Sequence, residues 1–376
     1  MSFQRVGLRS SAFGLGSLYF VLCTLIANQR YPINPRISKT KDHLGKLTYG
    51  KWFLIVLLTL LSSCSRKPNG PLAYVTNERD GTVTVIDTAT ERVVSTIKVG
   101  ARPRGIQLGP DRKTIWVALS YPTNQSQGED KIAVIDIATG AITKKFDAGT
   151  DPEQFVVNKD GSRLYIANED AGTASVTDTT ANKVIAAMPV GLEPEGVALS
   201  PDGRWVYITS ESSSTVAVLD TQTNQILKTF LVGARPREAV FTPDGTRAYV
   251  TAENGDNVCV IDVKDHSVSG KIELPHDNNG SALKPKGAVI SKDGQKIYVA
   301  TGRGNCVAVI EAATQKVLQL IPTGQRPWGI AFTPDGSKLY TANGLSNDVS
   351  VIDVASNKVT NTIRAGDGPW GVVIAP

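Results

Sequence analysis

The sequence contains few of the residues that most often hold metals, haem or disulfides. It has three histidines and four cysteines in 376 residues, and neither His266 nor His276 stands in a spacing typical of a zinc site. It also lacks a Cys-x-x-Cys-His motif for covalent haem and a Gly-x-Ser-x-Gly nucleophile turn. We therefore name no metal ligand, no cofactor and no catalytic residue, and we expect that the protein is not an enzyme.

The two cysteines of the main body, Cys259 and Cys306, are too few for a disulfide framework in an exported domain. They lie three residues before Asp262 and five residues before Glu311, near the ends of two repeated strands. Both therefore face the same side of neighbouring sheets and should not face each other. We expect two buried, unpaired thiols.

The main body also lacks an excess of positive charge. Residues 1–63 hold eight of the 40 Lys and Arg residues and one of the 35 Asp and Glu residues, which leaves 32 basic and 34 acidic side chains. A general nucleic-acid-binding protein needs a coherent basic surface. We therefore expect no nucleic acid as a partner.

An N-terminal stretch, residues 44–63, has the layout of a secretory signal. Two lysines precede an apolar run over 52–61, which is too short to span a bilayer. The run ends in Leu-Ser-Ser-Cys at Cys64, which resembles the bacterial lipobox; a plain signal peptide with a chance cysteine is the alternative. We expect lipidation at Cys64, a membrane anchor through this lipid, and a location on the periplasmic side of the bacterial cell envelope or at the outer membrane.

Residues 1–43 form an N-terminal extension with a second apolar run at 12–27. This run is either an extra membrane helix or the result of a start codon assigned too far upstream. A linker over 64–71 follows the signal segment, and the main domain is expected to cover 72–376.

The main domain repeats seven times with a period near 42 residues. The aromatic residue of the stretch "AYVTN" recurs at Tyr74, Trp116, Tyr165, Tyr207, Tyr249, Tyr298 and Tyr340. Each unit also contains a strand of the type Val-x-Val-Ile-Asp, and most units contain a Pro-Asp-Gly turn. Such units are rich in Val, Ile and Thr between Gly, Asp and Asn turns, and they fit four short strands each. The pattern predicts an all-β fold, a seven-bladed β-propeller of four-stranded antiparallel blades.

The two ends of the repeat predict how the ring closes. The chain enters at the second strand of a unit, "AYVTN", and finishes on "PWGVVIAP", which matches a first strand. The first blade is therefore expected to combine three N-terminal strands with one C-terminal strand, which would protect open sheet edges. A single domain of this size should be a monomer.

The repeated units resemble the YVTN family of propeller repeats, named for residues that stand here as Tyr74-Val75-Thr76-Asn77. Several stretches resemble a narrower group, the propellers associated with PQQ-dependent catabolism: "ANED" at 167–170, "GLEPEG" at 191–196, "GQRPWGIAFTPDG" at 324–336 and "GLSNDVSVIDV" at 344–354. Membership of this group implies an exported accessory protein of a quinoprotein dehydrogenase system. The lipobox and the basic extension are not features of that group.

A recurring x-Pro-x turn leads into the first strand of each unit, so we expect its side chains around one mouth of the central channel. The first turn, "GARPRG", has Arg102 and Arg104, which should share one strand face because side chains two residues apart point the same way. Two seven-residue insertions, within 120–130 and 274–287, fall in loops of the same face, and insertions often mark the binding face of a repeat protein. The candidate ligand- or partner-binding residues are Arg102, Arg104, Asp151, Glu153, Glu193, Glu195, Arg235, Arg237, Lys284, Lys286, Arg326, Trp328 and Trp370.

The charges at this mouth allow two interpretations. A ring of ion pairs could simply close the channel, because two boundaries bring opposite charges together: Arg102 and Arg104 with Asp151 and Glu153, and Glu193 and Glu195 with Arg235 and Arg237. Alternatively, acids stand beside acids at 151–153 and 193–195 and bases beside bases at 235–237 and 284–286, and such a two-signed funnel favours a ligand or partner.

We therefore expect an exported, lipid-anchored binding or scaffold protein, with an unidentified protein or small molecule bound at this upper face. A lactonase-type or metal-dependent hydrolase that uses carboxylates at the mouth is one alternative, and a cell-surface adhesion module is another.

Overall fold

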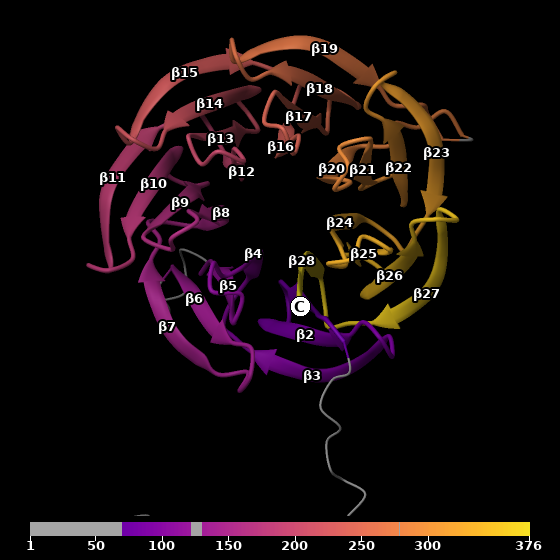
Figure 1. Ribbon diagram of the computed structural model, residues 1–376, viewed down its shortest axis with the longest axis horizontal. Helices are drawn as coiled ribbons and strands as arrows, with labels where there is room; N and C mark the ends of the chain where they lie inside the picture. The colour runs from indigo at the N-terminus through magenta and orange to yellow at the C-terminus, as the bar shows by residue number, and fades with distance from the viewer. Residues whose placement is uncertain (1–69, 122–129, 278) are drawn as a thin grey trace, which may run out of the picture. The chain divides into compact units, whose positions relative to one another are not determined.

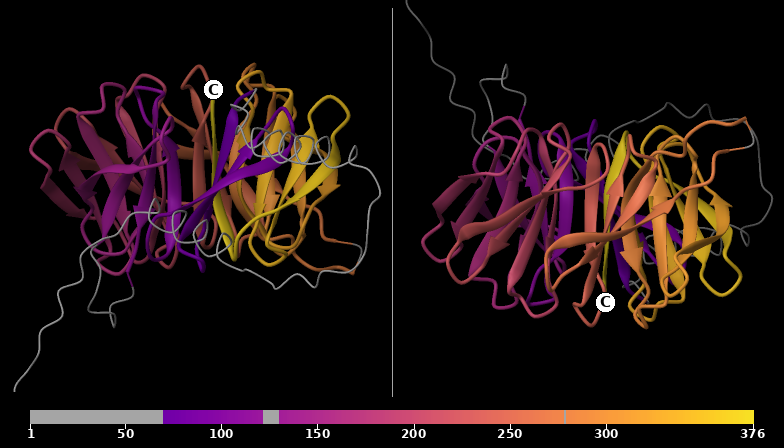
Figure 2. Two further views of the ribbon diagram at one scale, coloured as in Figure 1. Left: turned by 90° about the horizontal axis from the view of Figure 1, so that it is seen from below. Right: turned by 90° about the horizontal axis from the view of Figure 1, so that it is seen from above.

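The computed structural model describes residues 70–121, 130–277 and 279–376, which form a ring of seven four-stranded antiparallel sheets around a central channel (Figure 1). This confirms the predicted fold class. Seen from the side, the seven sheets, or blades, stand next to one another as a short cylinder (Figure 2). In these ranges we find no helix that could cross a membrane.

The strands fall into four sets by their distance from the channel, and we number the blades 1 to 7 in the order of these sets. The innermost strands are β28 (Pro369–Ala375), β4 (Pro103–Leu108), β8 (Pro152–Val157), β12 (Pro194–Leu199), β16 (Pro236–Phe241), β20 (Pro285–Ile290) and β24 (Pro327–Phe332). The second strands are β1 (Leu72–Asn77), β5 (Thr114–Leu119), β9 (Arg163–Asn168), β13 (Trp205–Ser210), β17 (Arg247–Ala252), β21 (Lys296–Thr301) and β25 (Lys338–Asn343). The third strands are β2 (Thr82–Asp87), β6 (Lys131–Asp136), β10 (Thr173–Asp178), β14 (Thr215–Asp220), β18 (Asn257–Asp262), β22 (Cys306–Glu311) and β26 (Asp348–Asp353). The outermost strands are β3 (Arg92–Lys98), β7 (Ile142–Asp147), β11 (Lys183–Pro189), β15 (Gln225–Leu231), β19 (Ser267–Glu273), β23 (Lys316–Pro322) and β27 (Lys358–Arg364).

Blade 1 closes the ring as predicted. Its strand order is β28-β1-β2-β3, and Leu72 of β1 pairs with Ala375 of β28 in an antiparallel register. The first and last described strands are thus hydrogen-bonded neighbours, and both edges that an open ring would expose are paired.

The core lies between neighbouring blades, where the buried second and third strands pack face to face. The repeated aromatic side chains all belong to second strands, and six tyrosines among them are at most 2% exposed. One core cluster, for example, joins Tyr249 and Val260 of blade 5 to Val299 and Ile310 of blade 6. Each such buried large apolar side chain contributes about 1.5–3 kcal/mol. The outermost strands are largely exposed, which explains their weaker apolar pattern.

The innermost strands approach one another closely because five of them have glycine as their third residue. A β-bulge interrupts the pairing at this point, for instance between Pro194 and Val197 in β12. A side chain on these glycines would meet the main chain of the next blade. The five glycines are Gly105, Gly196, Gly287, Gly329 and Gly371.

Threonines of the second strands join neighbouring blades at the same level. The Thr209 hydroxyl accepts a hydrogen bond from the Gly196 N–H at 2.8 Å and donates one to the carbonyl oxygen of Arg237 at 3.0 Å. Thr76 and Thr251 make the same bridge in blades 1 and 5. These bridges hold the second residue of each following inner strand, which carries the charged side chains of the channel.

Several predictions concern residues outside the described ranges: the extension 1–43, the signal segment 44–63, lipidation of Cys64, most of the linker 64–71, and most of the insertion at 120–130. The prediction for the two body cysteines is confirmed, because both Cys259 and Cys306 are buried and free.

Candidate functional site

The x-Pro-x turns place their side chains at the channel mouth in a way that strand alternation did not predict. Each innermost strand begins at the proline, so Arg102 precedes β4 instead of lying in it with Arg104. The expectation that these two arginines share one strand face is therefore wrong. The first residue of six turns has a left-handed φ of 40–62°, and the seventh turn has Gly368 at 70°. The six residues are Arg102, Asp151, Glu193, Arg235, Lys284 and Arg326.

Four further glutamates reach the mouth, and the sequence analysis missed all of them. Each follows directly after a second strand, in the loop that leads to the third strand. Their common position in the repeat was the available signal. They are Glu78, Glu169, Glu211 and Glu253, in blades 1, 3, 4 and 5.

The first ion-pair cluster surrounds Arg104. Its guanidinium lies 2.9 Å from a carboxylate oxygen of Glu78 and 3.3 Å from one of Glu169, and it also pairs with Glu153. Arg102 lies at the edge of this cluster, 3.6 Å from Glu78 and 3.4 Å from Asp151. Two predicted site residues of blade 2 thus meet two of blade 3, as the opposite charges suggested.

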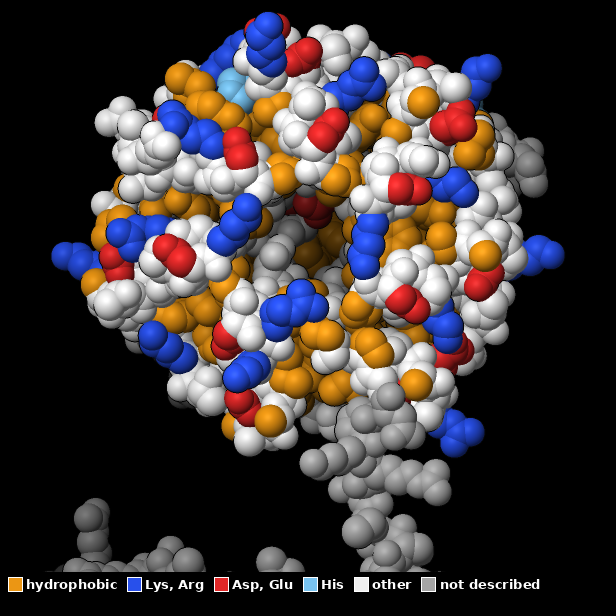
Figure 3. Space-filling model, in the orientation of Figure 1, with side chains coloured by type: hydrophobic (Ala, Val, Ile, Leu, Met, Phe, Trp, Pro, Cys, Tyr) orange, Lys and Arg blue, Asp and Glu red, His pale blue; other side chains and the backbone are white. Residues whose placement is uncertain are grey.

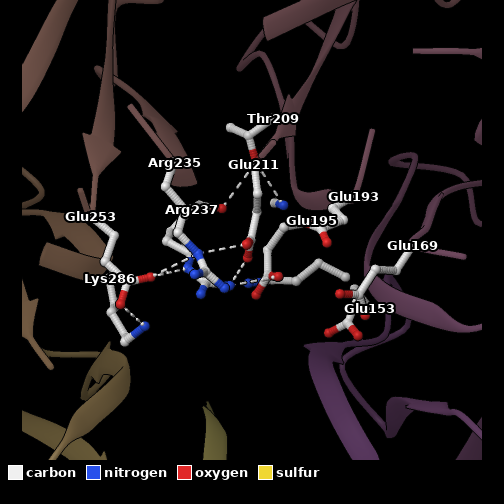
Figure 4. Close-up of polar contacts among 12 residues, drawn as sticks. Glu153, Glu169, Glu193, Glu195, Thr209, Glu211, Arg235, Arg237, Glu253 and Lys286 are labelled. Atoms are coloured by element: carbon white, nitrogen blue, oxygen red, sulfur yellow. Dashed lines mark hydrogen bonds and ion pairs between the residues drawn. The ribbon is translucent and has the colours of Figure 1, made fainter. Parts of the chain in front are cut away.

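The second cluster surrounds Arg237 (Figure 4). This arginine is 7% exposed. Arg237 lies 2.8 Å from Glu195 and 2.6 Å from Glu253, and it also pairs with Glu211. Arg235 extends the cluster with an ion pair of 2.7 Å to Glu211. One buried guanidinium therefore joins carboxylates of three different loops or strands, from blades 4 and 5.

Glu253 connects Arg237 to Lys286, whose Nζ lies 2.8 Å from the other carboxylate oxygen. Burial opposes ionisation of Glu253, but Arg237 and Lys286 outweigh it and lower the pKa of this carboxyl to about 2. Burial, reinforced by Arg237, lowers the pKa of Lys286 to about 8. At neutral pH the chain of charges is therefore ionised along its length.

These glutamates change the expected distribution of charge at the mouth, which was a funnel with one acidic and one basic side. The sequence places bases beside bases at 235–237 and 284–286, but Glu253 lies between the two sets and pairs with Arg237 and Lys286. At the acidic boundary, Arg104 and Arg237 each hold one neighbouring carboxylate. The mouth is thus a largely paired belt of charges.

An aromatic wall faces the charged belt. The rings of Trp328 and Trp370 lie 5.5 Å apart between centroids. Lys286 Nζ lies 3.9 Å from the centre of the Trp328 ring, and the guanidiniums of Arg237 and Arg326 lie 5.1 Å from it. Trp328 is half-buried and Trp370 is 6% exposed. Both rings line a mouth cavity of about 230 Å³, together with Glu153, Glu195 and Arg237.

The remaining predicted residues lie at the outer rim. Glu193 is exposed and accepts a hydrogen bond from the Ser212 hydroxyl. Lys284 donates a hydrogen bond of 3.3 Å to the Asn254 side-chain oxygen. These side chains surround the mouth without joining the two clusters.

One group of carboxylates has the spacing of a cation site. Ligand atoms of Asp151, Glu153 and Glu169 lie within 4.8 Å of one another. However, Arg104 already pairs with Glu153 and Glu169, and Arg102 pairs with Asp151. Burial raises the pKa of Asp151 to about 6, although both arginines oppose that shift. The guanidiniums therefore supply the positive charge that this group needs.

The comparisons with known proteins agree with this fold. Residues 229–375 match the family described as lactonase, 7-bladed beta-propeller, and residues 124–239 match the cytochrome D1 heme domain family. A seven-bladed beta-propeller protein of Mycobacterium tuberculosis is 29% identical over 31% of this chain and 29% of its own length. The protein YncE of Salmonella typhimurium is 28% identical over 48% of each chain. This chain therefore spans less than half the length of the curated relatives that it matches.

A solved structure, the periplasmic gluconolactonase PpgL of Pseudomonas aeruginosa, superposes with a TM-score of 0.69 at 19% identity. The superposition covers 81% of this chain and 99% of the other. This identity supports a shared fold alone. The chain is a seven-bladed β-propeller, and its repeats are consistent with the YVTN type.

Proposed function

We propose that this propeller binds a small polar molecule at the mouth of its central channel. The observation that carries the proposal is that two unlike surfaces adjoin in the lining of one cavity: the rings of the tryptophans at 328 and 370, and the charged belt around Arg237. A hydroxylated ring, such as a sugar acid or its lactone, would stack on the exposed part of Trp328 and exchange hydrogen bonds with the charged side chains.

Hydrolysis of a lactone is the second candidate, and the match to the lactonase family and the fold shared with a gluconolactonase favour it. Arg237 and Lys286 would stabilise the negative charge that develops on the carbonyl oxygen. A general base is harder to assign, because each glutamate that lines the mouth cavity is paired with an arginine. A carboxylate that an arginine already holds would have to leave this partner before it could accept a proton from water or substrate. Binding is therefore the first proposal.

The setting of this activity is also a proposal. The signal-like segment and the lipobox-like Cys64 favour export and a lipid anchor at the bacterial envelope. The narrower sequence resemblance favours a role beside a quinoprotein oxidation system, in which the propeller would bind a substrate, a product or a protein partner.

Calorimetric titration of the full chain with D-glucono-1,5-lactone and D-gluconate would test the proposal, with acid release followed in parallel. We expect saturable binding that Trp328→Ala weakens by about fivefold, since loss of a stacking contact costs on the order of 1 kcal/mol. Glu273→Gln, an exposed change on β19, is the matched control and should leave binding unchanged.

The outcomes separate the candidates. Acid release that disappears in Glu153→Gln or Glu195→Gln would replace the binding function by the hydrolase. An absence of binding and of turnover would overturn both. Co-purification of a protein in that case would support the scaffold role, and binding to cell-wall material would support the adhesion role.

A further inference from the structure

A second, larger chamber occupies the channel below the charged belt. It has a volume of about 480 Å³, and the belt residues Glu195, Arg237 and Lys286 form its upper end. Its walls combine apolar side chains of the innermost strands, such as Val197, Val240 and Ile330, with polar ones, such as Gln107, Gln154 and Glu238. The ring is hollowed at its centre on the face opposite the mouth, with hydrophobic side chains inside the hollow and basic ones around it (Figure 3). The chamber therefore has its own entrance.

Two side chains project from a level of the chamber at which the other five innermost strands have glycine. The third residue of the innermost strand is glycine in five blades, but it is Gln154 in β8 and Glu238 in β16. The Gln154 amide donates a hydrogen bond of 2.8 Å to Glu238, across the intervening blade 4 with its Gly196. The two residues that differ from the repeat thus form one polar pair in the wall of the chamber.

Glu238 differs from every carboxylate of the mouth cavity. In the part of the chain that the structure describes, no lysine or arginine forms an ion pair with it. The Glu238 side chain is part-buried in the chamber wall. Desolvation there raises its pKa to about 8, the charge of Glu195 on β12 acts in the same direction, and the hydrogen bond from Gln154 opposes the shift. Arg237 and Lys286, the nearby bases, are held by other carboxylates. The Glu238 carboxyl therefore keeps its proton at neutral pH and can donate a hydrogen bond.

The entrance to the chamber is basic. Lys159 and Lys292 stand at a repeat position that is proline in the other five blades. Lys159 donates a hydrogen bond of 2.6 Å to the carbonyl oxygen of Pro201, a residue of the chamber lining, and Lys292 lines the chamber itself. Ammonium groups around an apolar opening raise the local concentration of anions.

We propose that this lower chamber binds a small organic carboxylate. The apolar part of this ligand lies against the valine and isoleucine side chains, and its carboxylate accepts a hydrogen bond from the Glu238 carboxyl. Such charge-assisted hydrogen bonds are about twice as strong as neutral ones. The rim lysines attract the anion, and the bare glycine layer leaves room for it. The chamber shares Glu195, Arg237, Trp328 and Trp370 with the mouth cavity, but the proposed carboxylate site at Glu238 does not depend on the function proposed for the mouth.

Titration of the full chain with hexanoate, 1-hexanol and hexylammonium at pH 7 tests which ligand charge the chamber prefers, because the three molecules share one alkyl chain. We expect hexanoate to bind at least tenfold more tightly than hexanol, and hexylammonium to bind least. Lys292→Gln should weaken hexanoate binding and reduce its salt dependence. Equal or tighter binding of hexylammonium, or no binding of hexanoate, would overturn the proposal.

The pH dependence assigns the effect to Glu238. Above pH 8 the wild-type carboxyl loses its proton and repels the anion, so the affinity for hexanoate should fall by about tenfold per pH unit. Lys286 titrates in the same range, and Glu238→Gln separates the two groups because its amide donates at every pH. This variant should bind hexanoate within about threefold of wild type at pH 7 and keep that affinity at pH 9, whereas Glu273→Gln should behave as wild type. A wild-type pH profile that persists in Glu238→Gln would contradict the assignment.

Discussion

At the scale of single residues, Arg237 organises the charged belt. It pairs with Glu195, Glu211 and Glu253 while 7% exposed, so several desolvated charges depend on one guanidinium. A buried ion pair gives little net stability over an apolar alternative, but removal of one partner leaves the others uncompensated. The belt is therefore more sensitive to loss of Arg237 than to loss of any rim residue.

Arg237→Met should lower the free energy of unfolding by about 3–5 kcal/mol, because buried carboxylates lose their partner. Chemical denaturation at pH 7 would measure this change. Arg79→Met is the matched control: Arg79 pairs with Asp367 at 2.7 Å on the surface, where such a pair contributes about 0–1 kcal/mol. Equal effects of the two substitutions would show that the belt is not a cooperative unit.

The sequence predicts the belt in part. The x-Pro-x repeat correctly brings Arg104 to Glu153 and Arg237 to Glu195, because repeat position fixes where each main chain lies. It does not predict that Arg235 pairs with Glu211, since the reach of a long side chain depends on the left-handed turn before each strand. The four glutamates at the mouth each follow a second strand. The same repeat argument, applied to the residue after each second strand, would have predicted them.

At the scale of the element, the glycine at the third position of the innermost strand determines how closely neighbouring blades pack. The β-bulge of this strand and its third-residue glycine allow the main chains of adjacent blades to approach to within contact distance. The same glycine was visible in the sequence as part of the turn motif, but its role depends on a neighbouring strand some 42 residues away. Sequence spacing could not show that contact.

Gly196→Ala should destabilise the protein by about 1–3 kcal/mol, because the added methyl group would collide with the carbonyl oxygen of Arg237 in the next blade. Thermal and chemical unfolding would measure the change. Gly270→Ala on β19 is the control, since the new methyl there would meet only a flexible glutamine end and ordinary side-chain contacts. Unchanged stability in Gly196→Ala would mean that the blades can separate at this level without cost.

At the scale of the whole molecule, the ring depends on blade 1. The sequence predicted this closure correctly, because the terminal repeats are each incomplete and complementary. What it could not predict is the division of the channel into a mouth cavity and a lower chamber, since that division comes from side chains that meet across the ring.

Deletion of residues 369–376 removes β28 and leaves the edge of β1 unpaired. We expect loss of the cooperative unfolding transition, observed by circular dichroism, and a tendency to aggregate. A synthetic peptide with the deleted sequence should restore the transition by adding the missing strand. A truncated chain that melts like the full one would contradict a closed ring as the source of stability.

The pairing of β1 with β28 also has a consequence for biosynthesis. Leu72 and Ala375 are partners in one sheet, yet about 300 residues separate them along the chain, which a ribosome adds in roughly 15–60 s. During that interval β1 lacks β28, the inner neighbour that it has in the folded ring. The ring is therefore completed only after translation has passed the last blade, and any factor that guards the nascent protein has one defined edge to protect until then.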